Sequence, residues 1–181
     1  WADDVHHALH VALTGETGGY YADFTDAAAL PRALRDPFLY DGRYSRARGR
    51  RHGRPAGDVG GQRFVVALQN HDQVGNRAGG ERFGQTVSPG RARIGPALLL
   101  TAPYVPLIFA GEEWSASSPF PYFSGHTDPD LARAVTEGRR SEFADFGWDP
   151  VSVPDPQDPD TFERARLDWD ERGREPHAAM L

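Results

Sequence analysis

Three polar residues able to do chemistry follow directly on the apolar run "RFVVA". Asn70, His71 and Asp72 lie within "LQNHDQVGNR", which spans residues 68–77. A carboxylate accepts two hydroxyl hydrogen bonds at once, and an imidazole accepts or donates one more, so the group suits a polyol ligand. Folding alone does not require three such side chains at the end of a buried strand. The competing interpretation is that Asn70 and Asp72 only cap the strand and start a turn.

A second polar group ends another apolar run further along the chain. Glu112, Glu113 and Trp114 follow "VPLIFAG" directly. Carboxylates beside aromatic rings suit a carbohydrate cleft, because the rings stack on sugar faces while the carboxylates bind hydroxyl groups. Other aromatic residues that could contribute are Tyr20, Tyr21, Phe120, Tyr122 and Phe123.

Two strands are predicted to position these polar groups. Residues 62–69 and 105–114 are continuous apolar runs, which is typical of strands buried on both faces of a parallel sheet. Residues 88–102 predict the crossover helix, with Ser88 as N-cap and Pro89 at its first position. Functional groups of parallel α/β folds follow the carboxyl ends of the strands, so both polar groups are expected at one edge of the sheet. The residues expected to line one face of the helix are Ile94, Ala97, Leu98 and Thr101.

Helical patterns lie on both sides of this strand–helix–strand unit. Residues 2–16 have apolar residues at helical spacing, with Asp3 or Asp4 as a possible cap and Gly15 at the end. The other segments are predicted as helices over 25–39 and 130–148, as loops over 42–61 and 115–130, and as mostly irregular over 149–173.

Composition limits the class of protein. The chain has 181 residues, a net charge of −6 and 39% hydrophobic residues, which suits a globular piece of about one domain. It has no cysteine, so it forms no disulfide and no thiolate metal site. The acidic balance argues against nucleic acid, and the Arg-rich loop over 42–61 is expected to be solvated. The longest apolar stretch, residues 97–111, is broken by Pro103 and Pro106 and is shorter than the ~20 residues that cross a bilayer, so no membrane partner is expected.

The first predicted helix carries a possible metal pair. His6 and His10 are spaced i, i+4 on the face opposite the apolar stripe. No third ligand is evident, so a solvated or packed histidine face is favoured. We expect neither a metal nor another cofactor.

The two ends of the chain suggest a piece of a longer protein. The sequence opens at Trp1 rather than Met, and it stops at "HAAML" where a helix is just starting. No basic and apolar leader opens the chain, and we expect a cytoplasmic protein.

The segment "FVVALQNHDQVGNR" resembles the fourth signature segment of the alpha-amylase family of glycoside hydrolases, which ends barrel strand seven in that family. The resemblance runs from Trp1 to about Trp169. It implies that residues 1–181 are the C-terminal portion of a (β/α)8 TIM barrel, from the end of strand six through strand eight. The other segments that carry it are "WADDVHHALHVALTGETGGYYADF", "QNHDQVGNRAGGERF", "PLIFAGEEW…PFPYFSGH" and "EGRRSEFADFGW".

Within that family the resemblance is to the branch that releases trehalose from maltooligosyltrehalose. It implies hydrolysis of the α-1,4 bond next to the terminal trehalose by a retaining mechanism, which uses two carboxyl groups about 5–5.5 Å apart. In the family these groups lie on strands four and five, hence upstream of Trp1. Two or three strands cannot close a barrel, so the segment alone is expected to be inactive and poorly folded without the missing N-terminal part.

The resemblance also assigns roles to residues of this chain. Asp72 resembles the transition-state stabiliser, and His71 resembles the histidine that holds the same sugar. Asn70 is expected to orient the strand tip. Other expected or possible substrate contacts are Gln73, Arg77, Glu112, Glu113, Trp114 and Asp4, with His126 and Asp128 near a reducing-side sugar.

Two alternatives to this function stay open. The chain could belong to another alpha-amylase-family enzyme, such as an amylase or a branching enzyme, although "NHDQVGNRAGGERF" and "GRRSEFADFGW" argue against this. It could also be a non-catalytic carbohydrate-binding remnant, which the absence of the upstream carboxylates would favour if the chain were complete.

Overall fold

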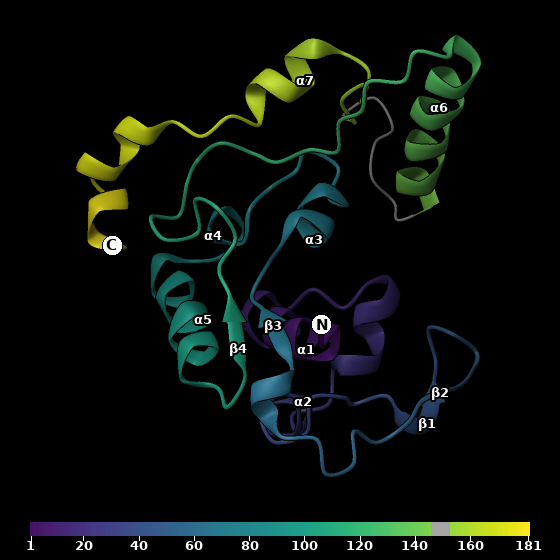
Figure 1. Ribbon diagram of the computed structural model, residues 1–181, viewed down its shortest axis with the longest axis vertical. Helices are drawn as coiled ribbons and strands as arrows, with labels where there is room; N and C mark the ends of the chain where they lie inside the picture. Colours follow the sequence, from purple (N-terminus) through teal and green to yellow (C-terminus); the bar gives the residue numbers. More distant parts are fainter. Residues whose placement is uncertain (146–152) are drawn as a thin grey trace. The chain divides into compact units, whose positions relative to one another are not determined.

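A computed structural model describes residues 1–145 and 153–181 of the chain (Figure 1). The chain separates into two compact units. The first comprises residues 1–68 and 87–108, and the second comprises residues 69–86 and 109–181.

The first unit contains a parallel strand pair. β3 (Val65–Ala67) pairs with β4 (Val105–Leu107), with Val65 opposite Val105 and Ala67 opposite Leu107. The crossover helix α5 (Pro89–Thr101) joins them, which confirms the predicted strand–helix–strand order. Both strands are much shorter than the apolar runs that contain them.

The two strands differ in burial, which corrects one expectation. Val66 and Ala67 of β3 are buried, whereas Val105 and Pro106 of β4 are exposed. In the described part of the chain, β4 pairs with β3 alone, so its other edge carries no strand. The prediction that both strands are buried on both faces therefore holds for β3 and is wrong for β4.

Helix α5 buries a different face from the one predicted. Ala92, Gly95 and Leu99 are buried, whereas Ile94 is 49% exposed and Leu98 is half-buried. The helix contacts α1. Ser88 stands at the N-cap position but makes no side-chain cap hydrogen bond.

Helix α1 (Asp3–Thr14) follows the predicted pattern closely. Its apolar stripe is buried except for exposed Ala12, and the helix ends at Gly15, whose φ of 78° is the left-handed conformation that favours glycine. Ala2, rather than Asp3 or Asp4, is the N-cap residue. The Ala2 amide donates to the Val65 carbonyl at 2.9 Å, which ties the start of the helix to β3.

The histidines of α1 are packed, and the prediction that they lie opposite the buried stripe is wrong. His6 and His10 are 2% and 5% exposed. Nδ1 of His6 lies 2.7 Å from the Leu68 carbonyl oxygen, and Nε2 lies 3.2 Å from the Tyr21 hydroxyl. No group of three or more His, Cys, Asp or Glu residues in the described ranges could hold a metal ion.

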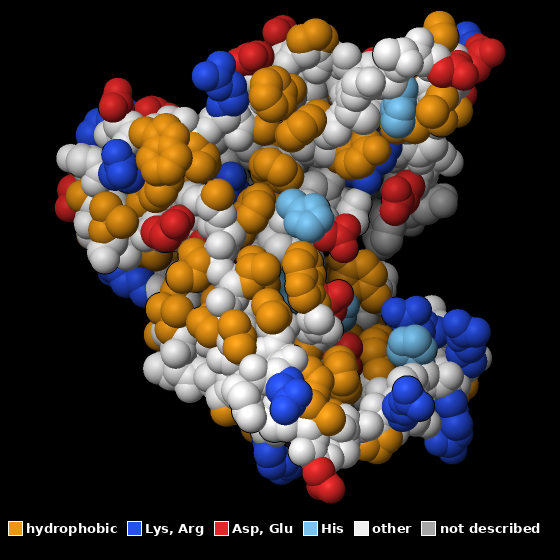
Figure 2. All heavy atoms as spheres, viewed as in Figure 1, with side chains coloured by type: hydrophobic (Ala, Val, Ile, Leu, Met, Phe, Trp, Pro, Cys, Tyr) orange, Lys and Arg blue, Asp and Glu red, His pale blue; other side chains and the backbone are white. Residues whose placement is uncertain are grey.

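Two predictions for the rest of the first unit are wrong in part, because the structure has short elements there. The predicted helix over 25–39 is reduced to α2 (Ala29–Ala33), and the predicted loop over 42–61 contains an antiparallel hairpin. Basic side chains gather over this hairpin in Figure 2. The elements concerned are η1 (Gly19–Phe24), β1 (Asp41–Ser45), β2 (Arg50–Gly53) and η2 (Gly61–Arg63).

Gly53 explains why the hairpin could form in so polar a segment. Its φ is +71°, and a Cβ there would lie 1.7 Å from the Tyr40 carbonyl oxygen, so only glycine lets the strands meet at this point. In β1, Arg43 donates two hydrogen bonds to the Asp41 carboxylate, at 3.0 Å each. This guanidinium lowers the pKa of Asp41 to about 2.

The second unit consists of helices and long connections. The helix predicted over 130–148 is confirmed as far as Asp145, and residues 146–148 lie outside the described ranges. The expectation of a mostly irregular 149–173 is wrong in part, because Asp158 and Asp168 cap short helices there. The elements are α3 (His71–Gly75), α4 (Phe83–Thr86), α6 (Pro129–Asp145), α7 (Pro159–Arg164), η4 (Trp169–Gly173) and η5 (His177–Ala179).

Within residues 1–145 and 153–181, every helix is too short or too polar to span a membrane. The expected cytoplasmic location stays a prediction, as do the expected absences of a cofactor and of nucleic acid as a partner.

Candidate functional site

The Asn-His-Asp sequence begins a helix rather than ending a strand. Asn70 is the N-cap residue of α3, and its Oδ1 accepts from the backbone amides of Asp72 at 2.9 Å and Gln73 at 3.2 Å. Asn70, which is 1% exposed, is thus a capping residue, but it caps a helix and not the strand that the competing interpretation proposed. His71 and Asp72 lie in the first turn, and both are exposed.

A residue at the C-terminal end of the same helix, Asn76, is hydrogen-bonded to the Asp72 carboxylate. Oδ1 of Asp72 accepts from Nδ2 of Asn76 at 2.9 Å. The exposed carboxylate therefore has one oxygen in a fixed position and acceptor capacity remaining for a ligand.

Two polar atoms of the same helix are buried without a hydrogen-bond partner among the described residues. They are Nδ2 of Asn70, a donor, and Oε1 of Gln73, an acceptor. Buried polar groups in folded proteins are nearly always hydrogen-bonded. The two atoms therefore leave hydrogen-bonding capacity at the start of α3 that no described residue uses. Arg77, by contrast, forms an ion pair with Glu81 at 3.4 Å.

The second polar group lies in a turn that follows β4 in the sequence. Oε2 of Glu112 accepts from the Phe109 amide at 3.1 Å, and Oε2 of Glu113 accepts from the Gly111 amide at 2.9 Å. Glu112 is buried, whereas Glu113 is exposed. Burial raises the pKa of Glu112 to about 7, and the neighbouring Glu113 charge adds to this shift.

Trp114 packs inside the second unit instead of presenting a ring face. It is 3% exposed, its Nε1 donates to Oε2 of Glu171 at 3.3 Å, and its ring centroid lies 5.1 Å from that of Trp169. Its burial disfavours a direct stacking contact with a sugar, which was the chemistry expected of it.

Sequence reasoning missed two charged residues that hold this turn. Arg82 is 2% exposed, and it donates from Nε to the Ser118 carbonyl at 2.6 Å and from Nη1 to the Ala110 carbonyl at 2.7 Å. Glu171 is 6% exposed and also accepts from Ser117. Arg82 stands in the segment "QNHDQVGNRAGGERF", but no local signal marks either residue as a support of this turn, since their partners are 28 to 57 positions away in the sequence.

The long connection before α6 is held by its own polar side chains. Oδ1 of Asp128 accepts from the Asp130 amide at 2.9 Å and the Leu131 amide at 3.3 Å, so it caps α6. The His126 amide donates to Oε1 of Gln157 at 3.0 Å.

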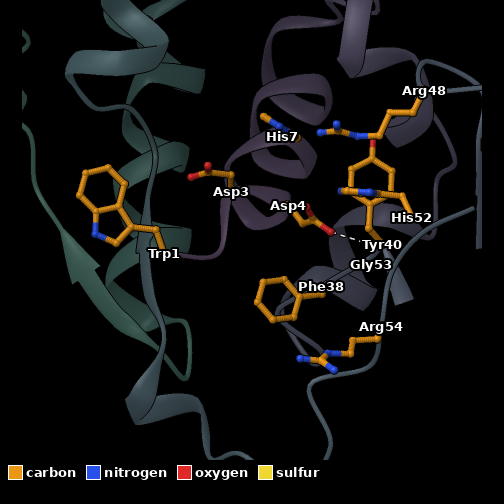
Figure 3. Close-up of a pocket in the computed structure, with 10 residues that line it drawn as sticks. All are labelled: Trp1, Asp3, Asp4, His7, Phe38, Tyr40, Arg48, His52, Gly53 and Arg54. Atoms are coloured by element: carbon orange, nitrogen blue, oxygen red, sulfur yellow. Dashed lines mark hydrogen bonds between the residues drawn. The ribbon is translucent and has the colours of Figure 1, made fainter. Parts of the chain in front are cut away.

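A pocket of about 390 Å³ lies in the first unit (Figure 3). Asp4, on α1, is 8% exposed, and its Oδ2 accepts from the Tyr40 amide at 2.8 Å. Burial raises the pKa of Asp4, and burial together with the His10 and Arg48 charges lowers the pKa of His7 to about 4. The other lining residues are Trp1, Asp3, Phe38, Tyr40, Arg48, His52, Gly53 and Arg54.

This pocket combines carboxylates with aromatic rings and nitrogen donors. Figure 3 shows His7, Arg48, Tyr40 and His52 gathered on one side of it, while Trp1 and Asp3 lie on the other. Such a lining suits a ligand rich in hydroxyl groups. Of these residues, sequence reasoning selected Asp4 as a site residue. It missed Arg48 and His52, because the segment that forms the hairpin was predicted to be a loop.

The raised pKa of Glu112 predicts how the stability of the protein depends on pH. Its raised pKa means that the folded protein binds a proton more tightly than the unfolded chain, so stability falls as the pH rises from about 4.5 to about 7. Glu112→Gln removes this penalty. Its melting temperature in the complete protein is expected to exceed that of the wild type at pH 8 and to match it near pH 4.5. Glu137→Gln, an exposed change on α6, is the control, and an equal gain at both pH values would refute the assignment.

The comparisons with known proteins first define the class of protein that the chain resembles. No family model matches the sequence. A solved structure described as an alpha amylase from Salmonella typhimurium matches the fold with a TM-score of 0.90 and 45% sequence identity, over 99% of this chain and 31% of that one. The chain is thus an α/β protein similar in structure to part of an alpha-amylase-type protein.

The curated relatives narrow this class. Proteins named malto-oligosyltrehalose trehalohydrolase from Brevibacterium helvolum and from Rhizobium sp. (strain M-11) are each 50% identical to this chain over 183 aligned residues. One from Saccharolobus solfataricus is 46% identical over 169 residues. The chain is therefore a homologue of the malto-oligosyltrehalose trehalohydrolases, and it spans about 31% of the length of the first two.

Proposed function

We propose that this chain is the C-terminal portion of the catalytic (β/α)8 barrel of a maltooligosyltrehalose trehalohydrolase, from the end of strand six through strand eight. The complete protein hydrolyses the α-1,4 bond next to the terminal trehalose and releases trehalose with a retaining mechanism. The observation that carries this proposal is the 50% identity to trehalohydrolases over the whole chain. The parallel pair β3–β4, joined by α5, fits two neighbouring barrel strands.

Asp72 is the residue that we assign to chemistry. Its exposed carboxylate can bind ring hydroxyl groups of the sugar being cleaved, and such hydrogen bonds strengthen as positive charge builds on the ring. His71, beside it in the same helical turn, holds the same sugar. The nucleophile and the general acid/base come from the part of the protein upstream of Trp1.

The remaining proposed contacts differ in how well their positions suit a substrate. Gln73 and Asn70 each have a buried polar atom without a partner in the described ranges, which supports a role for them near the ligand. Among the three residues after β4, exposure favours Glu113 over Glu112 and Trp114. Arg77, already paired with Glu81, and Asp4, in the pocket of the first unit, complete the proposed set.

The first unit exposes apolar surface, and this supports the proposal that its partner is the N-terminal part of the same protein. The free edge of β4 can accept another parallel strand, and four large apolar side chains on or beside α5 and β4 are 42–55% exposed. Barrel closure would cover them, because each strand of a barrel has two neighbours. These residues are Ile94, Leu100, Val105 and Ile108.

A comparison of two substrates tests the proposed reaction. The complete protein is expected to release trehalose from maltooligosyltrehalose and to leave a plain maltooligosaccharide of equal length largely uncut, as measured by chromatography of the products. Equal hydrolysis of both would make the protein an amylase instead, and binding of either substrate without cleavage would make it a carbohydrate-binding protein.

A further inference from the structure

A chain of hydrogen bonds connects Asp72 to helix α6. Nη1 of Arg139 donates to Oδ1 of Asn76 at 2.8 Å, and Nδ2 of Asn76 donates to Oδ1 of Asp72 at 2.9 Å. Arg139 is 63 positions beyond Asn76 and 67 beyond Asp72 in the sequence, and all three residues belong to the second unit. A guanidinium on α6 is thus joined to the carboxylate on α3 through a single amide.

Arg139 is itself held on several sides. Its Nη2 donates to the Gly75 carbonyl, at the end of α3, at 2.6 Å, and its guanidinium carbon lies 4.6 Å from the centroid of the Tyr122 ring. The side chain is half-buried, and burial lowers its pKa while the charges of Glu142, Tyr122 and Asp72 oppose that shift. An arginine remains protonated under such conditions, so it places a fixed positive charge behind α3.

Arg139 and Asp72 together fix which way the amide of Asn76 points. An Asn side chain has one accepting end and one donating end, whereas a guanidinium can only donate. Asn76 must therefore turn its oxygen to Arg139, which leaves its NH₂ group facing Asp72. Without Arg139 the Asn76 oxygen loses the partner that holds it, and the amide is free to move away from the carboxylate.

We infer that Arg139 and Asn76 are positioning residues that hold the Asp72 carboxylate in its working orientation. Asn76 occupies one carboxylate oxygen, so the other is directed to the sugar, and the charge of Arg139 reaches Asp72 through the polarised amide. This inference rests on the proposed function, because it matters for turnover only if Asp72 contacts the substrate.

The test measures kcat and KM for maltooligosyltrehalose in the complete protein. Arg139→Gln and Asn76→Ala are each expected to lower kcat by about 10-fold to 100-fold with a smaller change in KM, because misplacing a catalytic group affects the transition state most. Arg140→Gln removes the same charge from the next, exposed position of α6 and is expected to leave kcat unchanged.

A double-mutant cycle separates positioning from general damage. In an Asp72→Asn background, Arg139→Gln and Asn76→Ala are expected to lower kcat by less than about twofold, because the group that they position is already lost. Arg139→Lys, which keeps the charge, is expected to recover part of the activity. Since Asn76 is exposed, its variant keeps the test decisive if Arg139→Gln fails to fold.

The possible outcomes distinguish the two proposals. Equal losses of kcat in the wild-type and Asp72→Asn backgrounds would overturn the positioning role and leave the assignment of Asp72 intact. Normal turnover of Asp72→Asn would instead overturn the proposed role of Asp72, on which the inference rests.

Discussion

Replacing Asp72 with asparagine in the complete protein is expected to lower kcat for maltooligosyltrehalose by about a hundredfold to a thousandfold, the range for loss of one group that stabilises developing charge. Asparagine keeps the shape of the side chain but not the negative charge that opposes the positive charge on the sugar ring. The change should act on kcat more than on KM, since the interaction strengthens on the way to the transition state.

Asp130→Asn is the matched control for this experiment. Asp130 also lies in the first turn of a helix of the second unit, is exposed, and forms an ion pair with Arg133 one turn away. The same chemical change there is expected to leave kcat within about twofold, because single exposed ion pairs contribute little. Near-normal turnover of Asp72→Asn, measured by steady-state trehalose release, would refute the role assigned to Asp72.

The second large effect is expected on stability. Arg82→Met should lower the free energy of unfolding by about 3 kcal/mol, because hydrogen bonds from a charged donor contribute about 1.5–3 kcal/mol each. The substitution removes the donors to the Ser118 and Ala110 carbonyls and leaves both oxygens without their present partner. It also removes the positive charge that counteracts the raised pKa of buried Glu112.

The control for Arg82 is an exposed arginine of the same unit. Arg166→Met, which breaks a surface ion pair with Glu163, is expected to change stability by less than about 0.5 kcal/mol. Urea denaturation of the complete protein, followed by fluorescence, measures both variants. If the two variants proved equally stable, Arg82 would not be the residue that holds the turn around Glu112.

Local patterns in the sequence were sufficient for several elements. Helix α1, its end at Gly15 and the order β3, α5, β4 follow from apolar spacing and from glycine and proline preferences, which act between neighbours in the chain. The choice of Asn70, His71 and Asp72 as a polar group after a buried strand also came from the sequence. The resemblance to the alpha-amylase family rested on those same residues, and the relatives confirm it.

Interactions between distant parts of the chain decided the rest. Buried His6 is hydrogen-bonded to the Leu68 carbonyl, the β1–β2 hairpin depends on the close approach of Gly53 to Tyr40, and α5 contacts α1. None of these partners lies within a local sequence window, and helix or strand periodicity carries no information about them.

The same division applies to the candidate site. The sequence alone selected the carboxylate of Asp72, because residue type and position after an apolar run are local properties. The tertiary structure showed that Asn70 caps a helix and that Arg139, 67 positions beyond Asp72, reaches the carboxylate through Asn76. Such a contact depends on where the tertiary structure places Arg139 relative to α3, which no spacing within the sequence specifies.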